Sequence, residues 1–237
     1  MRTQDSNQSA SNPLAVLEAF ALACAVTLAL VLFFQVIAES ENPRGTWLKE
    51  GGVIEDAQAL LFLLAAVGFV MAMRASQSLK DGPRWRYIPI LAWAALMFVA
   101  FGEEVSWGQR ILGLETPTSG IFAENVQNEI NFHNLPMLNR AKGIILNDFI
   151  LVVGVLLPLV ALLPPVRWMV RVFAFPVSPV VYLPVFLGAY LVHSYQIYSF
   201  EDFGYMPREY SELLLALGFA LFAWRGVSVR DSLFRAT

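Results

Sequence analysis

The chain has 237 residues, of which 57% are hydrophobic, and a formal net charge of −3. Its mean hydropathy of +0.57 excludes an ordinary water-soluble domain and predicts an integral membrane protein. The sequence contains no basic patch for nucleic acid, and its single cysteine, Cys24, excludes an internal disulfide.

Several apolar runs approach the roughly 20 residues that a helix needs to cross the hydrocarbon core of a bilayer. Pro179 and Pro184 interrupt the fifth run, and Glu209 and Glu212 open the sixth. We therefore predict an all-α membrane bundle of about six transmembrane helices over 14–225, between a cytoplasmic tail, 1–13, and a cytoplasmic C-terminal tail, 226–237. The runs are 14–38, 53–73, 87–101, 144–163, 177–197 and 209–224.

The basic residues predict the orientation of these helices. Lys and Arg are more frequent in the N-terminal tail, in the loops 74–86 and 164–176 and in the C-terminal segment than on the opposite side. Because short cytoplasmic loops carry the basic excess, both termini are predicted to lie in the cytoplasm.

Most of the 19 acidic residues fall on the opposite, outer side, many of them at the predicted helix ends. One interpretation is a ring of carboxylates around a single vestibule. The other is that acids at helix starts cap the helix dipole. The dipole does not explain Glu103 and Glu104, which follow the C-terminal end of a span. The acids at helix ends are Glu55, Asp56, Glu103, Glu104, Asp148, Glu201, Asp202, Glu209 and Glu212.

The chain has only two histidines, His133 and His193, and both are predicted to lie toward the outer side. If 124–134 is helical, Asn125, Glu129 and His133 share one stripe at positions i, i+4 and i+8. We expect a short interfacial helix within an outer re-entrant or interfacial segment, 102–143.

Two kinds of chemistry fit these residues. Glu129, His133 and His193 are candidate ligands for a divalent metal such as zinc or iron. Alternatively, Glu103 and Glu104, together with His133 and His193, form a metal-free catalytic group in which one glutamate acts as a general base on water. The simpler interpretations are a surface hydrogen bond between Glu129 and His133 and an interhelical hydrogen bond from His193.

The paired glutamates look like the EExxxR motif of CAAX-type intramembrane proteases. Here Arg110 follows Glu104 by six residues instead of four, and no FxxxH pattern surrounds either histidine. The likeness is therefore one of mechanism only. Ser106, Trp107, Gln109 and Arg110 are candidate substrate-binding residues, with Arg110 suited to an anionic head group.

The strings FGEEVSWGQRILGLETP and NVQNEINFHNL, with KEGGVIE before the second run, resemble bacterial multi-pass inner-membrane proteins that carry a GEE-x-SWGQR signature. The resemblance covers about a fifth of the chain. It implies a location in the bacterial inner membrane. The signature positions that it marks are Glu103, Glu104, Ser106, Trp107, Gln109, Arg110, Glu129 and His133. It implies no activity.

Two functions of different classes are consistent with the sequence. The first is a membrane-embedded hydrolase or transferase that acts on a lipid or lipid-linked substrate. The second is a non-catalytic accessory or assembly subunit that docks other membrane protein subunits through its acidic face. A transporter is less well supported, because no inverted repeat is visible. The enzyme requires that Glu103, Glu104, His133 and His193 converge on one pocket.

Overall fold

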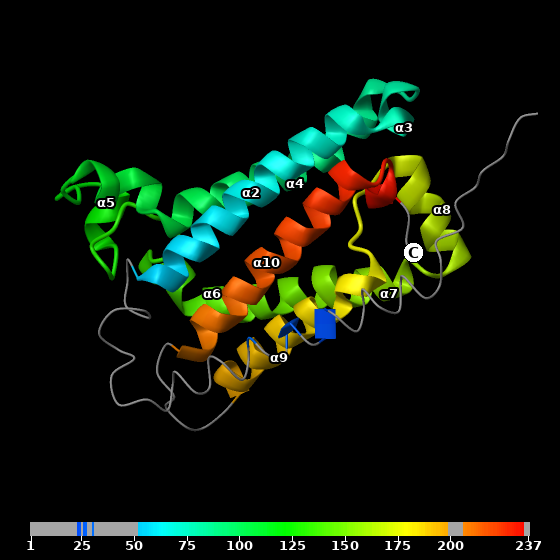
Figure 1. Ribbon diagram of the computed structural model, residues 1–237. Helices are drawn as coiled ribbons and strands as arrows, with labels where there is room; N and C mark the ends of the chain where they lie inside the picture. The colour runs from blue at the N-terminus through cyan, green and yellow to red at the C-terminus, as the bar shows by residue number, and fades with distance from the viewer. Residues whose placement is uncertain (1–22, 25, 28–29, 31–51, 199–205, 235–237) are drawn as a thin grey trace, which may run out of the picture.

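A computed structural model describes residues 23–24, 26–27, 30, 52–198 and 206–234 (Figure 1). These residues form helices and turns without a strand among them, which confirms the all-α prediction. The elements are α2 (Val53–Ala75), α3 (Gln77–Lys80), η1 (Arg84–Tyr87), α4 (Ile88–Glu104), η2 (Ser106–Gly108), α5 (Gln109–Leu112), η3 (Ile121–Glu124), α6 (Pro136–Phe149), η4 (Ile150–Leu156), α7 (Leu157–Val160), α8 (Pro164–Phe173), η5 (Val180–Tyr182), α9 (Leu183–Tyr198), α10 (Met206–Ser228) and η6 (Ser232–Phe234).

Four helices are long and apolar enough to cross a membrane, and they match the second, third, fourth and sixth predicted runs. They are Val53–Ala75, Arg84–Glu104, Ala141–Val160 and Arg208–Ser228. The fifth run forms a shorter apolar helix, Val180–Tyr195. Most of the first run, 14–38, lies outside the described residues, so the number of six spans stays a prediction.

The helices form a row with α10 at its centre. α10 packs against α2 on one side and α9 on the other; α4 packs against α2, and α6 with η4 packs against α9. Figure 1 shows α10 in orange between the cyan α2 and the gold α9. Small residues allow α2 and α10 to pack closely, since a Cβ atom on Gly68 would lie 2.9 Å from Cβ of Ala223. The row leaves α4 and α6 at its two ends.

Aromatic side chains join the two ends of this row across the middle of the bundle. The ring of Trp93 on α4 lies 6.3 Å from that of Phe149 on α6 and 5.2 Å from that of Phe219 on α10, and Phe149 and Phe219 are 6.1 Å apart. We call these three residues the aromatic triad. Phe69 and Phe186 pack behind it.

The backbone of the fourth span departs from a regular α-helix. α6 continues into η4, a π-helical stretch, and then into α7. Pro158 cannot donate a hydrogen bond to the preceding turn, and its ring crowds the carbonyl four residues earlier, so an irregular helix is expected there. Gly154 permits close packing here, because a Cβ atom on it would lie 2.7 Å from Cβ of Phe186.

We name the two ends of the bundle by what they hold. The site end contains the start of α2, the end of α4, residues 105–135 and the start of α10; the far end contains α3, α8 and η6. At the far end, the carboxylate of Asp231 accepts hydrogen bonds from the Ser76 hydroxyl, at 2.6 Å, and the Ser78 hydroxyl, at 2.9 Å. Leu233 and Phe234 are buried. Within the predicted C-terminal tail, 226–237, α10 thus continues to Ser228, and η6 packs on the core.

The helix predicted for the segment 124–134, at the site end, is not observed. Residues 124–134 do not form a helix: η3 ends at Glu124 and turns follow. The carboxamide oxygen of Asn125 accepts from the backbone N–H groups of Gln127, at 3.0 Å, and Glu129, at 3.2 Å. Because these side-chain bonds replace helical ones, the expected stripe of Asn125, Glu129 and His133 does not form.

Candidate functional site

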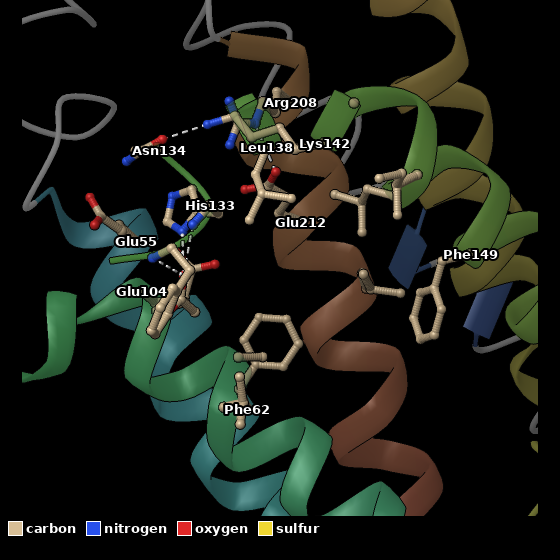
Figure 2. Close-up of a pocket in the computed structure, with 18 of the residues that line it drawn as sticks. Glu55, Phe62, Glu104, His133, Asn134, Leu138, Lys142, Phe149, Arg208 and Glu212 are labelled. Atoms are coloured by element: carbon tan, nitrogen blue, oxygen red, sulfur yellow. Dashed lines mark hydrogen bonds and ion pairs between the residues drawn. The ribbon is translucent and has the colours of Figure 1, made fainter. Parts of the chain in front are cut away.

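A cavity of about 1140 Å³ lies at the site end, enclosed by α2, α4, α6, α9, α10 and the loop 127–134 (Figure 2). Glu103, Glu104, His133 and His193 all line it, so the four predicted catalytic residues share one cavity. The volume exceeds the roughly 300–1,000 Å³ of a typical small-molecule pocket. The cavity therefore has room for a large ligand.

The part of the cavity nearer the site end, which we call its upper part, is polar and is lined by ionisable residues from four helices. Glu55, Glu104, Lys142 and Glu212 each come from a different helix, and we call them the upper ring. Figure 2 shows His133 among them. Five of the acids predicted at helix ends line the cavity, namely Glu55, Glu103, Glu104, Glu209 and Glu212. Asp56 and Asp148 are exposed and do not line it, and Glu201 and Asp202 lie outside the described residues.

Its lower part is apolar, and the change occurs at the same depth on all four helices. Phe62, Met97, Phe149 and Phe219 each lie seven residues from an upper-ring residue of the same helix, and we call them the lower ring. Seven residues are about two helical turns, which places this ring about 10 Å deeper on the same helix faces. The aromatic triad, which includes two of these residues, closes the bottom. The cavity is thus amphipathic along its length.

Glu103 and His133 form the most directed polar contact in the cavity. Nδ1 of His133 lies 3.2 Å from Oε2 of Glu103, which also accepts from the backbone N–H groups of Phe132, at 2.8 Å, and His133, at 2.9 Å. Since a carboxylate only accepts, Nδ1 carries the proton in this pair. Among the described residues no partner occupies Nε2. That nitrogen is therefore available as a base toward the cavity.

The turn after α4 explains how Glu103 is held. Ser106, Trp107 and Gly108 have φ values of 46°, 52° and 84°, a left-handed run that is costly for the first two residues. The run folds the indole back over α4, where its Nε1 donates to Oε1 of Glu103 at 2.7 Å. Gly102 leaves space for the ring, since a Cβ atom on it would lie 2.8 Å from the indole.

Three of the four candidate substrate-binding residues, Ser106, Trp107 and Gln109, do not line the cavity. Ser106 and Gln109 are buried, and Trp107 contacts α4. The carboxamide oxygen of Gln109 accepts from the backbone N–H of Ile130 at 2.6 Å, and its nitrogen donates to Thr116 Oγ1 at 2.9 Å. Gln109 and Ser106 therefore bond to the loop that carries His133, whereas Trp107 bonds to Glu103. Their role in substrate binding stays a prediction. The side chain of Arg110 lies outside the described residues.

The other histidine joins three helices. His193 is 1% exposed; its Nε2 lies 3.0 Å from the carbonyl oxygen of Gly143 on α6, and its Nδ1 lies 2.8 Å from Oγ of Ser211 on α10. A carbonyl can only accept, so Nε2 donates to Gly143 and Nδ1 accepts from the Ser211 hydroxyl. Both ring nitrogens are used within the protein. This geometry is the interhelical hydrogen bond that the sequence offered as the simpler interpretation.

Cations and carboxylates are mixed in the upper part of the cavity. Nε of Arg208 donates to Oε1 of Glu212 at 2.8 Å, and Nζ of Lys142 donates to Oδ1 of Asn134 at 2.6 Å. Lys142 and Arg208 thus place two positive groups in the polar part of the cavity, where they can attract an oxyanion.

The three predicted metal ligands do not come together. No group of three His, Cys, Asp or Glu side chains among the described residues is arranged to hold a metal ion. Glu129 accepts hydrogen bonds from Asn131 and Asn134, and His133 bonds to Glu103. Both ring nitrogens of His193 already have hydrogen-bond partners. The described residues therefore show no metal site on Glu129, His133 and His193, and zinc or iron stays a prediction.

No protein-family model matches the chain, and no match was found among curated proteins or solved structures.

The lower ring and Asn134 are site residues that the sequence reasoning missed. A charged residue followed by Phe seven positions later occurs at Glu55, Lys142 and Glu212, on three separate spans. This repeated spacing indicates that the side chains change from polar to apolar at the same depth on the three spans. The position of Asn134 has no comparable signal, since it depends on the turns of the loop.

Proposed function

We propose that the protein is a multi-pass membrane enzyme, a hydrolase or transferase that acts on the polar part of a lipid or lipid-linked substrate. In this proposal it lies in the bacterial inner membrane with six spans and both termini in the cytoplasm, so that the site end faces outward. The single observation that carries the proposal is the Glu103–His133 pair at the polar part of an amphipathic cavity.

The pair suits general acid–base catalysis. Glu103 holds the Nδ1 proton of His133, which orients the ring and leaves the Nε2 lone pair to accept a proton. His133 then removes a proton from water, or from an acceptor hydroxyl, as its oxygen forms a bond to the substrate's phosphorus or carbonyl carbon. The imidazolium, stabilised by the adjacent carboxylate, returns that proton to the oxygen that leaves.

The positive groups suit the charge that develops in such a step. A transferred phosphoryl or acyl group gathers negative charge on its oxygens in the transition state. Lys142 and Arg208 lie in the same polar part of the cavity (Figure 2). Glu212 pairs with Arg208 in the cavity, so one of the two cations already has a carboxylate partner.

The test is turnover by purified protein in lipid nanodiscs. Phospholipids and polyprenyl-linked phosphates and sugars are supplied as a panel, and mass spectrometry records released head groups and transferred chains. His133→Gln is expected to lower turnover by about 10²–10⁴-fold, the usual contribution of a general base. Glu103→Gln should lower it as well. Glu124→Gln, an exposed carboxylate outside the cavity, is the matched control and should have no effect.

Two results would overturn the proposal. One is retention of wild-type turnover by His133→Gln. The other is a folded wild-type protein that converts no member of the panel and copurifies with a stoichiometric partner after gentle solubilisation, which would favour the accessory subunit.

A further inference from the structure

The cavity has a side opening between the two helices at the ends of the row. α4 and α6 do not pack extensively along their upper halves, and among the described residues they meet at the aromatic triad. Leu96 and Val99 of α4 line the cavity, yet they are 42% and 45% exposed. Ile145 of α6 also lines it and is 59% exposed. Side chains that face both the cavity and the outside mark an opening.

This opening lies within the spanning part of the molecule. Leu96 and Val99 belong to the span Arg84–Glu104, and Ile145 belongs to the span Ala141–Val160. Around them the outward side chains of the same helices are apolar and exposed, as at Phe98 and Ile144. In a membrane such side chains contact alkyl chains, so the opening joins the lower part of the cavity to the hydrocarbon layer.

The two rings define which part of a ligand fits where. A polar group is favoured beside the upper ring and His133, and an alkyl chain is favoured about 10 Å deeper against the lower ring, since buried apolar surface is gained there. The aromatic triad stops a chain from going further down. A chain longer than this depth must leave through the opening between α4 and α6.

We propose that the substrate is a membrane lipid that enters sideways between α4 and α6, with an alkyl chain resting on the lower ring and its head group beside His133. This inference rests on the proposed function and adds the route of entry and the seat of the chain. A water-soluble substrate would have no use for an opening at this depth.

The test places a photo-crosslinker inside the cavity. p-Benzoylphenylalanine replaces Phe149 in protein reconstituted into nanodiscs of phosphatidylethanolamine and phosphatidylglycerol, and mass spectrometry identifies lipid adducts after illumination. The same replacement at Phe98, which is exposed on α4, should give adducts in any case. At Phe186, which is buried outside the cavity, it should give none.

A matched pair of variants then tests the opening. Ile144 and Ile145 are neighbours on α6 and are 57% and 59% exposed, but only Ile145 lines the cavity. In the protein labelled at position 149, Ile145→Trp is expected to lower the adduct yield by about tenfold, because a bulky ring narrows the opening. Ile144→Trp should leave it unchanged. Elution volume and melting temperature confirm that both variants fold.

The outcomes separate this inference from the proposed function. Absence of lipid adducts at position 149, with adducts at 98, overturns the side entry, as does an equal yield in Ile144→Trp and Ile145→Trp. Adducts that respond to Ile145→Trp in a protein without turnover support the entry route and refute the enzyme. Turnover of a lipid without adducts at 149 supports the enzyme and refutes the seat of the chain.

Discussion

His193 offers the sharpest test of which polar residues hold the fold and which serve the cavity. The His193→Ala variant removes a side chain that bonds α9 to both α6 and α10. It leaves the Ser211 hydroxyl and the Gly143 carbonyl without these partners, and it opens a void at a position that is 1% exposed.

The expected cost follows from these losses. Interhelical hydrogen bonds in membrane proteins average about 0.6 kcal/mol and reach about 1.7 kcal/mol. The void left by a large buried side chain adds about 1–2 kcal/mol. We therefore expect His193→Ala to lower the free energy of unfolding by about 2–4 kcal/mol. Ser211→Ala, which removes one of the two bonds, should cost about 1 kcal/mol.

Unfolding in mixed micelles, followed by circular dichroism as the fraction of denaturing detergent rises, measures this cost. Leu191→Ala is the control, because this residue is on the same helix and is 56% exposed. The double variant His193→Ala/Ser211→Ala should be destabilised by less than the sum of the single changes, since both remove the same bond. Wild-type stability of His193→Ala, combined with loss of ligand binding or turnover, would refute this reasoning and make His193 a site residue.

Three further changes test the packing of the bundle, the anchoring of its C-terminal segment and the position of Glu103. Gly154→Ala should lower the melting temperature, because a methyl group would clash with the phenylalanine ring beside it, whereas Gly143→Ala, with its nearest contact at 3.9 Å, should not. Asp231→Ala should speed hydrogen exchange and proteolysis of 232–234, because it frees the C-terminal segment from α3, while the exposed Asp81→Ala should not. Trp107→Phe keeps the ring over α4 but deletes a hydrogen bond to the neighbouring carboxylate, so it should lower turnover while a fold-sensitive circular dichroism spectrum stays unchanged.

Each of these has a clear contrary result. Equal melting temperatures for the two glycine variants would refute the close contact of α9 with η4. Equal exchange rates for the two aspartate variants would refute the anchoring of η6. Wild-type turnover in Trp107→Phe would show that the indole nitrogen does not position the pair.

The spanning helices were predictable because they depend on a property that is local in sequence. An apolar run such as 53–73 must be helical in a bilayer, since backbone groups find no other partners there. The convergence of the charged helix ends followed from the same reasoning, because alternate spans bring their ends to the same side. Topology therefore predicts that Glu55, Glu104 and Glu212 lie on one side of the membrane, whereas their place in one cavity depends on how the helices pack.

The loop that carries His133 could not be predicted in the same way. A helical spacing of Asn125, Glu129 and His133 exists in the sequence, but the amide groups of the segment bond to its own backbone and favour turns. The contact of His133 with Glu103 joins residues 30 positions apart. It depends on the left-handed turn after α4, which no periodicity reveals.

The roles of the two histidines also required three-dimensional contacts. The sequence makes His193 a functional candidate, because an ionisable residue inside a span suggests function. The structure places Ser211 and the Gly143 carbonyl on either side of its ring, so this histidine is engaged in packing. His133, in a loop, has the available nitrogen.

A crystal structure from a lipidic mesophase would test the central claim most directly, since the protein would be surrounded by alkyl chains during crystallisation. We expect continuous density for a chain from the gap between α4 and α6 to Phe149, with a polar group within hydrogen-bond distance of Nε2 of His133. Helices α4 and α6 closed against each other, with Glu103 and His133 apart, would contradict it.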